Sequence, residues 1–380
     1  MIIIVAPYSP VSLTSTPHLG AARKIEMVIE TLSELDSDIM LVNSAHNNLD
    51  AVAQIEEIII SGVTVKHYTL TCYSSQKLGK LFNLKDASAA VNKCLEFGNP
   101  KLLWLYNSYA FENNFSRILN KKVDVPVIFE FEDWHFSRSR GLNPKPYIDH
   151  LLWKLNLKNI NFAFGVNDKL VNKMKKFGVS SQLLPGIVPV NLIESCDKSC
   201  CFNNKLIKVG YFGGLSVEKG VDKIIEIVEQ LPENFKLVIS GAGHLETNLQ
   251  ELMEQFSDKL EFHGRVSESQ LYTLIASVDV ILNPHSPITD MSEGVFPFKV
   301  IEGIASGRLL ISTPVPSAKV AGLLDGVLFY DGTSNQLLDS IVSSKDFYNN
   351  HNEKIIASMC IAREEFSKAS ILKPILPLIK

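Results

Sequence analysis

The sequence has 380 residues, which at about 150 residues per domain predicts two large domains. Hydrophobic residues make up 46% and charged residues 21% of the chain, as in ordinary globular proteins, which excludes wholesale disorder. The formal net charge of −4 disfavours a basic nucleic-acid-binding protein, so we expect no nucleic-acid partner.

Cysteine use and hydropathy indicate the compartment. Six cysteines in so long a chain do not make a disulfide scaffold, and Cys72, Cys94 and Cys360 stand alone. The segment 1–7 lacks the charged and apolar regions of a signal peptide, and no run reaches the roughly 18 to 20 apolar residues that span a bilayer. We therefore expect a cytoplasmic protein, with attachment to the inner face of the membrane left open.

Short buried strands alternate with amphipathic helices along the first half of the chain. The helix of residues 21–35 places Ile25, Val28, Ile29 and Leu32 on one face. The predicted strands are residues 2–6, 39–42, 63–68, 102–106 and 125–131. Continuous apolar strands separated by helices predict a parallel sheet that is covered on both faces.

The alternation stops at about residues 188–204 and then restarts. In the second half the predicted strands are 205–212, 235–240, 260–263, 279–283 and 309–313, and the predicted helices are 220–231, 245–256, 268–277 and 297–306. We therefore predict an α/β protein with two Rossmann-like parallel-sheet domains facing one another across a cleft. The expected divisions are an N-terminal domain 1–187, a linker 188–204, a C-terminal domain 205–352 and a helical segment 353–380 that is a candidate to cross back.

The most informative stretch is 294–312. Pro297 suits the first position of a short helix, whose unpaired N–H groups and positive dipole end favour an anion. Lys299 adds a cation in the first turn, and Glu302 follows one turn later, where its carboxylate can accept hydrogen bonds from ribose hydroxyls. Together these features describe a site for a nucleoside diphosphate, with an exposed helix glutamate as the alternative interpretation of Glu302.

A second phosphate element follows the first strand of the second half. Gly213 and Gly214 end that strand and permit close backbone approach to a ligand. Lys219 opens the next helix and can reach a pyrophosphate. A glycine pair alone is a weak signal, and Lys219 and the helix that starts at Pro297 make it more specific.

Four blocks of sequence resemble, in order and spacing, the C-terminal half of the family-four glycosyltransferases of GT-B fold. These blocks are 213–220, 240–243, 262–267 and 292–307. The resemblance covers about residues 205–316. It implies transfer of a sugar from a nucleotide donor with retention of anomeric configuration, in a cleft between two domains that close by hinge motion.

Site residues follow from the resemblance position by position. It implies that Lys219 neutralises the leaving diphosphate and that Glu302 binds the ribose. The other implied donor contacts are the turn at Gly243, Arg265 and Val266 beside the nucleobase, the amides of Phe296, Pro297 and Phe298 with Lys299 at the phosphates, and the loop ending at Gly20 in the first half.

Two positions depart from the family pattern. Gly214 stands where the family usually has arginine, so Lys219 should carry more of the charge stabilisation. The family's two glutamates are separated by seven residues, whereas Glu293 and Glu302 are separated by eight, so Glu293 is out of register by one. Glu293 is still expected at the donor sugar, with Asp290 as its alternative.

The acceptor site is expected in the first half. Asp133 and His135 follow a predicted strand whose carboxyl end lies where parallel sheets bind ligands. Both are candidate catalytic residues, with fixation of the loop as the competing interpretation. The sequence is equally consistent with Glu130 as a paired interior carboxylate. Trp134 is a candidate to stack on a sugar ring, but an aromatic residue at a strand end is more often part of the core.

The predicted activity is transfer of a sugar, UDP-linked, to a glycan or lipid-linked acceptor in surface polysaccharide biosynthesis, with no cofactor and no metal. Cys196 and its neighbours lack the partners of a metal site. Lys169, Lys173, Lys175 and Lys176 form a cluster that suits anionic lipid or simply a solvated helix face. Among the histidines near loop ends, His18, His263 and His285, the first has the best claim on the cleft. A sugar-nucleotide epimerase and a silent nucleotide-sugar-binding partner are the competing functions.

Overall fold

The computed structural model describes residues 1–9, 19–45, 54–70, 83–137, 143–197, 202, 205–286, 296–315 and 319–379. The chain forms two compact units. The N-terminal unit comprises residues 1–185, 293–296 and 368–380, and the C-terminal unit comprises residues 186–292 and 297–367. No helix among the described residues is long and apolar enough to cross a membrane.

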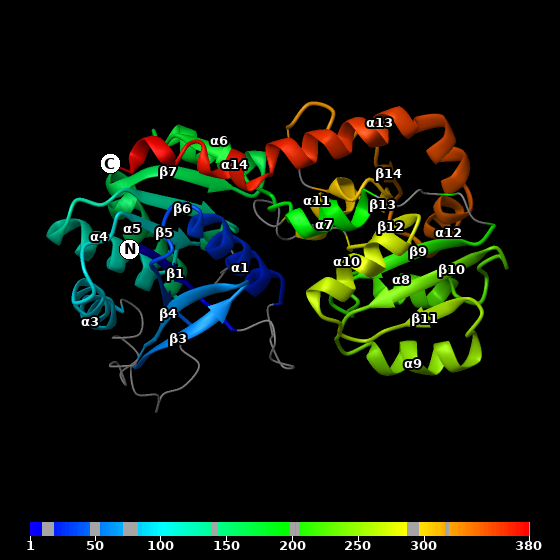
Figure 1. Cartoon of the computed structure of the whole chain (residues 1–380), viewed down its shortest axis with the longest axis horizontal. Coiled ribbons are helices and arrows are strands. Elements are labelled where there is room, and N and C mark those ends of the chain that lie inside the picture. The colour runs from blue at the N-terminus through cyan, green and yellow to red at the C-terminus, as the bar shows by residue number, and fades with distance from the viewer. Residues whose placement is uncertain are drawn as a thin grey trace. The chain divides into compact units, whose positions relative to one another are not determined.

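The N-terminal unit is built around one eight-stranded sheet (Figure 1). Its strands are β1 (Ile2–Ala6), β2 (Ile39–Asn43), β3 (Gln54–Ile60), β4 (Val63–Thr69), β5 (Leu102–Tyr106), β6 (Val127–Phe131), β7 (Ile160–Gly165) and β8 (Ser181–Leu183). Its helices are α1 (Leu19–Ser33), α3 (Leu84–Leu95), α4 (Ala110–Lys122), α5 (Lys145–Asn156), α6 (Asp168–Lys176) and α14 (Lys368–Leu372), with short 3₁₀ turns at His135–Ser137, Leu157–Asn159 and Leu376–Leu378.

The strand order is β3-β4-β2-β1-β5-β6-β7-β8. Every pair is parallel except β3 with β4, which form an antiparallel hairpin at the edge. The hairpin turns through Ser61 and Gly62, both with positive φ (49° and 80°), as a two-residue turn requires. Strand β3 was not predicted from the sequence, because this edge strand is largely exposed and lacks the continuous apolar run of a buried strand.

The core of the sheet is formed by strands that are buried along their whole length. All residues of β1, β2, β5 and β6 are buried, as the predicted parallel sheet covered on both faces requires. The chain leaves β1 towards β2 on one side, and β5 lies on the other side of β1. The carboxyl ends of β1 and β5 are therefore the switch point where open α/β sheets bind ligands.

The C-terminal unit contains a six-stranded sheet of order β11-β10-β9-β12-β13-β14, with all pairs parallel. Its strands are β9 (Ile207–Phe212), β10 (Phe235–Ser240), β11 (Leu260–Phe262), β12 (Val280–Asn283), β13 (Leu309–Ser312) and β14 (Leu328–Phe329). Its helices are α7 (Val190–Cys196), α8 (Val221–Ile227), α9 (Glu246–Gln255), α10 (Glu268–Ser277), α11 (Phe298–Ala305), α12 (Ser334–Val342) and α13 (Ser344–Glu365). Two parallel-sheet α/β units are thus present, as predicted.

The ends of the helices and strands lie close to those predicted, whereas the boundaries between the two units differ more from the prediction. Residues 188–204, read as a linker, contain helix α7, which packs against α10. The terminal segment is divided, since α13 belongs to the C-terminal unit and residues 368–380 to the N-terminal unit.

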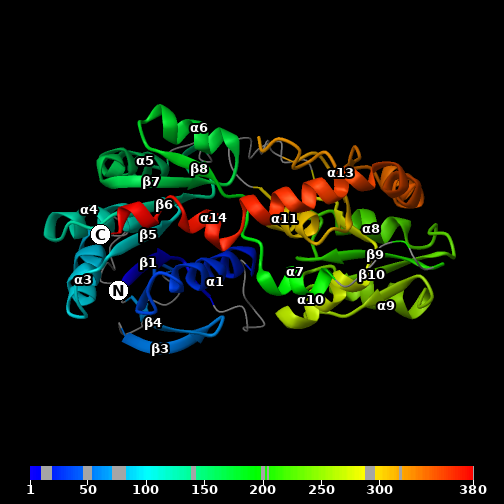
Figure 2. The ribbon, with the colours of Figure 1, turned by 45° about the horizontal axis from the view of Figure 1, so that its top comes forward.

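Helix α14 packs on α1 within the N-terminal unit, as Figures 1 and 2 show (red beside dark blue). Lys368 Nζ lies 2.6 Å from Glu30 Oε1. Ile371, Leu372 and Ile375 are buried. Ile371, Leu372 and Ile375 are therefore part of the core of the first unit.

Candidate functional site

The loop that follows β9 carries the glycine pair and Lys219. The Tyr211 hydroxyl donates a hydrogen bond of 2.7 Å to the carbonyl oxygen of Gly214 and thereby fixes the loop against the strand. Gly213 has φ of +156°, and a Cβ atom there would lie 3.8 Å from Lys299 Nζ. A Cβ atom on Gly214 would lie 4.0 Å from Lys219 Cγ. Lys299 and Lys219 therefore lie beside Gly213 and Gly214, and the role of these residues at a phosphate stays a prediction.

Lys219 is held by two neighbours. Its Nζ lies 3.0 Å from Glu218 Oε1 and 3.0 Å from His285 Nε2. An ammonium group only donates, so Nε2 of His285 accepts, and His285 Nδ1–H donates to the carbonyl oxygen of Ser286 at 2.9 Å. Burial and the nearby lysine charges lower the pKa of His285. His285 is therefore a neutral imidazole that orients the Lys219 ammonium.

The contact of His285 with Lys219 was not predicted from the sequence, which places His285 only near a loop end. Its loop is tied to the Lys219 loop by a hydrogen bond of 3.0 Å from Ser286 N to the carbonyl oxygen of Glu218. The pairing joins residues that are 66 positions apart. The sequence signal for this contact is that His285 comes two residues after the buried strand β12, at the edge of the sheet where the phosphate site is predicted.

Lys299 lies in the first turn of α11, whose N-cap is Pro297. Its ammonium lies 4.4 Å from the centroid of the Tyr211 ring. Burial and, secondarily, the Lys219 charge lower the pKa of Lys299 to about 7. Two cationic groups and a helix N-terminus therefore occupy one edge of this sheet, and together they favour an anion.

Glu302 lies three residues after Lys299 and on the same face of α11. Its side chain is 5% exposed, so the alternative of an exposed helix glutamate is wrong. Phe298 packs near Gly186, where an added Cβ atom would lie 2.9 Å from the ring. Phe296 is buried and assigned to the N-terminal unit, whereas Pro297 begins the next segment of the C-terminal unit.

The remaining predicted donor residues lie at adjacent strand ends. Gly243 packs against the Leu215 backbone, where an added Cβ atom would lie 2.3 Å from the carbonyl oxygen. The carbonyl oxygen of Gly264 accepts hydrogen bonds of 2.8 Å from Gly241 N and Ser240 Oγ. Arg265 and Val266 are both half-buried directly after it. Gly243 is therefore required for loop packing, and the nucleobase role of Arg265 and Val266 stays a prediction.

Gly220 turns the chain between the Lys219 loop and α8. Its φ is +74°, and an added Cβ atom would lie 1.8 Å from the Pro284 carbonyl oxygen. We predict that Gly220→Ala lowers the free energy of unfolding, measured by urea titration, by about 3 kcal/mol. Gly264→Ala is the matched control, because its φ is +61° and no atom lies within 4 Å of the added Cβ. It should cost about 1 kcal/mol, and equal losses for the two variants would contradict the packing argument.

Some predicted site residues belong to the N-terminal unit, and others lie outside the described residues. Gly20 is an exposed residue in the first turn of α1, and nothing lies within 4 Å of a Cβ atom added there. His18, Glu293 and Asp290 lie outside the described residues. Their expected roles stay predictions.

Glu130 is a paired interior carboxylate. Its Oε1 lies 3.0 Å from Lys24 Nζ, and its Oε2 accepts a hydrogen bond of 2.9 Å from Trp104 Nε1. Lys24 also binds Glu132 and donates to the carbonyl oxygen of Leu184 at 3.2 Å. Burial and the neighbouring Glu130 raise the pKa of Glu132 to about 7 despite the opposing Lys24 charge. Two carboxyl groups thus share one buried ammonium.

Asp133 and His135 follow this cluster at the carboxyl end of β6. Asp133 is half-buried, and the buried His135 ring stacks on Tyr109 with 4.3 Å between centroids. Trp134 packs on Phe131 and Trp153, each at 5.5 Å between centroids. Trp134 is therefore part of an aromatic cluster, whereas the catalytic roles of Asp133 and His135 stay predictions.

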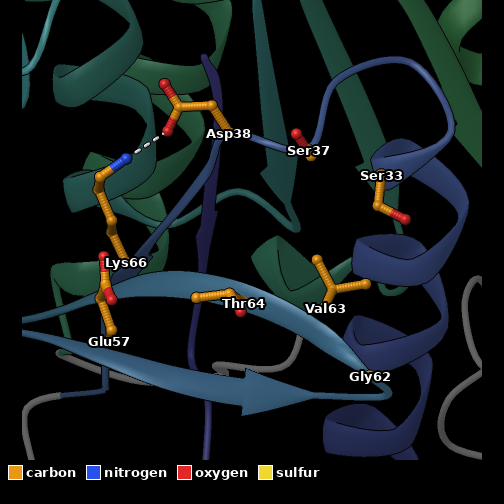
Figure 3. A pocket seen from close by; sticks show the side chains of 8 residues that line it. All are labelled: Ser33, Ser37, Asp38, Glu57, Gly62, Val63, Thr64 and Lys66. Atoms are coloured by element: carbon orange, nitrogen blue, oxygen red, sulfur yellow. Dashed lines mark hydrogen bonds and ion pairs between the residues drawn. The ribbon is translucent and has the colours of Figure 1, made fainter.

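A cavity of about 490 Å³ lies elsewhere in the N-terminal unit (Figure 3). Its lining includes Ser33 at the end of α1, Gly62 in the hairpin turn, and the ion pair of Asp38 with Lys66. Asp38 precedes β2 and Gly62 precedes β4, so the cavity is at the amino-terminal edge of the sheet. This is the edge opposite to the predicted ligand sites. Within the described ranges no group of three His, Cys, Asp or Glu residues is arranged to hold a metal ion.

Comparison with known protein sequences finds a family match within the C-terminal unit. Residues 207–344 match the family described as Glycosyl transferases group 1. A glycogen synthase from Hydrogenovibrio crunogenus is 26% identical over 183 residues, which cover 45% of this chain and only 37% of that protein. An uncharacterized glycosyltransferase from Methanocaldococcus jannaschii is 22% identical over 364 residues, which cover 93% of this chain and 88% of that protein.

Solved structures share the fold over nearly the whole chain. HepE from Anabaena, solved in complex with UDP, is 15% identical with a TM-score of 0.65 and covers 99% of this chain and 98% of its own. Sucrose-phosphate synthase from Thermosynechococcus elongatus is 14% identical with a TM-score of 0.59, covering 98% and 99%. A glycosyltransferase from Rickettsia africae is 14% identical with a TM-score of 0.67, covering 100% and 97%. These likenesses establish the GT-B fold.

Proposed function

Because residues 207–344 match the family described as Glycosyl transferases group 1, we propose that this chain is a glycosyltransferase whose donor is a nucleoside-diphosphate sugar, UDP-linked, and that the sugar goes to a glycan or lipid-linked acceptor. We further propose retention of configuration and a role in surface polysaccharide biosynthesis. The structurally similar HepE from Anabaena has been solved with UDP and with UDP-glucose, which supports the choice of base.

One observation carries the proposal: two lysines and a helix N-terminus meet at the glycine loop of the C-terminal unit. Breaking a glycosyl phosphate bond develops negative charge on the departing diphosphate. Lys219 and Lys299 flank the Gly213–Gly214 pair, and their charges interact. Preorganised cations of this kind stabilise the charge where it grows.

The remaining donor contacts are proposed by position. The buried Glu302, one turn behind Lys299, is the candidate acceptor for the ribose hydroxyls. The backbone after Gly264, with Arg265 and Val266, is the candidate surface for the base. Glu293 is proposed at the donor sugar, and Asp133 and His135 at the acceptor hydroxyl.

Ligand-dependent thermal stabilisation tests the donor. A panel of UDP, GDP, ADP and CMP should raise the melting temperature of the full chain most with UDP, because a ligand that binds only the folded state stabilises it with concentration. No shift with any of them would contradict the nucleotide site. A larger shift with GDP, ADP or CMP would assign that nucleotide to the donor in place of UDP.

Product analysis separates the competing activities. Incubation with UDP-glucose should release UDP slowly, since a transferase without its acceptor uses water. An isomerised sugar nucleotide would instead indicate an epimerase. Tight binding with no product would indicate a silent binding partner, for which Gly214 in place of arginine is the supporting observation.

The low pKa of Lys299 predicts a pH dependence of donor binding. The free ammonium has a pKa of about 7, and a bound diphosphate favours the charged form, so the bound-state pKa is higher. Affinity is therefore full below pH 7 and falls as pH rises through the free-state value. Between pH 7.5 and 8.5 the Kd for UDP should rise about tenfold, with proton uptake measurable by calorimetry in buffers of different ionisation enthalpy.

Lys299→Met is the control for that assignment. It should bind UDP more weakly at pH 7 and lose most of the pH dependence. His285 does not interfere, because burial lowers its pKa below 6.5 and it stays neutral throughout this range. A variant that keeps the wild-type pH profile would assign the effect to another group.

A further inference from the structure

An exposed apolar stripe runs along helix α5. Tyr147, Leu151 and Leu155 follow one another at intervals of four residues and therefore share one face. Their exposed fractions are 67%, 55% and 45%. The opposite face of the helix carries Leu152 and Trp153, which are buried in the unit. The helix thus has an inner apolar face in the core and a second apolar face in solvent, which soluble surfaces rarely show.

Exposed lysines accompany the stripe. Lys154 lies seven residues after Tyr147 and on the same side of α5. Lys158 follows in the 3₁₀ turn after α5, and both lysines are exposed. Lys175 and Lys176 are exposed at the end of α6, next to Phe177, whose side chain is 43% exposed.

Ring contacts hold α5 and α6 side by side, as Figure 2 also shows. Phe177 packs edge-on against Trp153 of α5 with 5.0 Å between centroids. Trp134 bridges the two helices, because its ring lies 5.7 Å from that of His150 on α5 and 3.6 Å beneath Lys173 Nζ on α6. These contacts place α6 beside α5, so the exposed lysines at the end of α6 lie near the exposed residues of α5.

The positive charge of this surface indicates what kind of partner it binds. Residues 143–178 contain seven lysines and two acidic residues, Asp149 and Asp168. Asp149 is buried and bound by Lys145 Nζ at 3.1 Å, so it does not offset the exposed lysines. A partner that fits must offer dense negative charge above an apolar layer. Anionic phospholipid headgroups over acyl chains provide this combination.

We propose that the exposed face of α5 and the end of α6 form a docking surface for anionic lipid bilayers. The lysine ammonium groups pair with headgroup phosphates while Tyr147, Leu151 and Leu155 enter the acyl boundary. This surface belongs to the N-terminal unit, whereas Lys219 and Lys299 belong to the C-terminal unit, so it goes beyond the proposed donor chemistry. It also provides a means of reaching a lipid-linked acceptor.

Vesicle sedimentation with the full-length protein tests the proposal. The chain should sediment with phosphatidylglycerol–phosphatidylcholine vesicles and not with phosphatidylcholine alone. Binding at about 0.05 M salt should be largely lost at about 0.5 M, because salt screens the headgroup attraction. Reversing Lys154, Lys158, Lys175 and Lys176 to Glu should weaken binding by about a hundredfold or more. Leu151→Ser with Leu155→Ser should weaken binding without changing the charge.

A matched variant controls for total charge. Lys121, Lys205, Lys345 and Lys354 are exposed lysines outside this surface, and their reversal to Glu changes the net charge equally. This control should keep most of the binding. The proposal is overturned if the wild-type chain does not bind anionic vesicles at low salt, or if the control loses as much binding as the α5–α6 variant. UDP-induced thermal stabilisation of the variants reports on the donor site separately.

Discussion

Replacing Lys219 by alanine should lower kcat by about 10²–10³, the usual loss for one preorganised group that stabilises developing negative charge. Gly214 occupies the place where arginine is usual in the family that the sequence resembles, so Lys219 carries a larger share of that stabilisation. We expect the loss in kcat rather than in KM, because the charge on the diphosphate grows as the glycosyl bond breaks.

The fold should survive this change. Lys219 is partly exposed, and its pairing with Glu218 is of the surface kind, which contributes little to stability. Far-UV circular dichroism and the melting temperature should match those of the wild-type chain. Lys219→Arg should retain part of the activity. Lys223→Ala, which removes a nearby lysine paired with Glu226, should change kcat less than twofold. A Lys219→Ala variant with more than half of the activity would exclude Lys219 from the mechanism.

Replacing Lys24 by methionine should lower the free energy of unfolding by about 3–5 kcal/mol, because removing one partner of a buried ion pair leaves uncompensated charge. The Lys24 and Glu130 side chains are 4% and 1% exposed. Without the ammonium, Glu130 and Glu132 are two carboxyl groups in one buried site. Urea titration, followed by a signal from the N-terminal unit, measures the loss.

The same variant should show a characteristic pH dependence. The pKa of Glu132 is already raised by burial and by Glu130, and without Lys24 it rises further. A carboxyl group with a raised pKa in the folded state destabilises the fold increasingly as pH rises through the ordinary carboxylate range. The loss should therefore be smaller at pH 5 than at pH 8. Lys93→Met, which breaks the exposed pair with Glu96, should cost less than about 1 kcal/mol at either pH. A Lys24→Met loss of that size would contradict the buried-pair argument.

The parts of the fold that local sequence determines were predictable. Buried parallel strands such as 102–106 and 235–240 are continuous apolar runs, and their bounds agree with the structure. The hairpin strand β3 was missed, because its residues face solvent and give no such run. The return of the terminal segment to the first unit was predicted only as a candidate, and which residues return depends on packing against α1, which no local pattern encodes.

For the candidate site too, local features were predictable from the sequence and long-range contacts were not. The glycine pair, Lys219 and the helix after Pro297 are local signals at strand ends, and sequence alone brought them together. The contact of Lys219 with His285 and that of Lys24 with Glu132 join residues 66 and 108 positions apart. Such pairs follow from strand order, which determines which loops become neighbours, and strand order was not part of the prediction.

The return of the chain into its first unit has a consequence for biosynthesis. Residues 368–375, which complete the hydrophobic contact with α1, are synthesised after the whole of the C-terminal unit. The α1 surface therefore stays uncovered until these residues have left the ribosome. We expect nascent chains that stop before Lys368 to be held by chaperones or degraded, even though they contain every strand of both sheets.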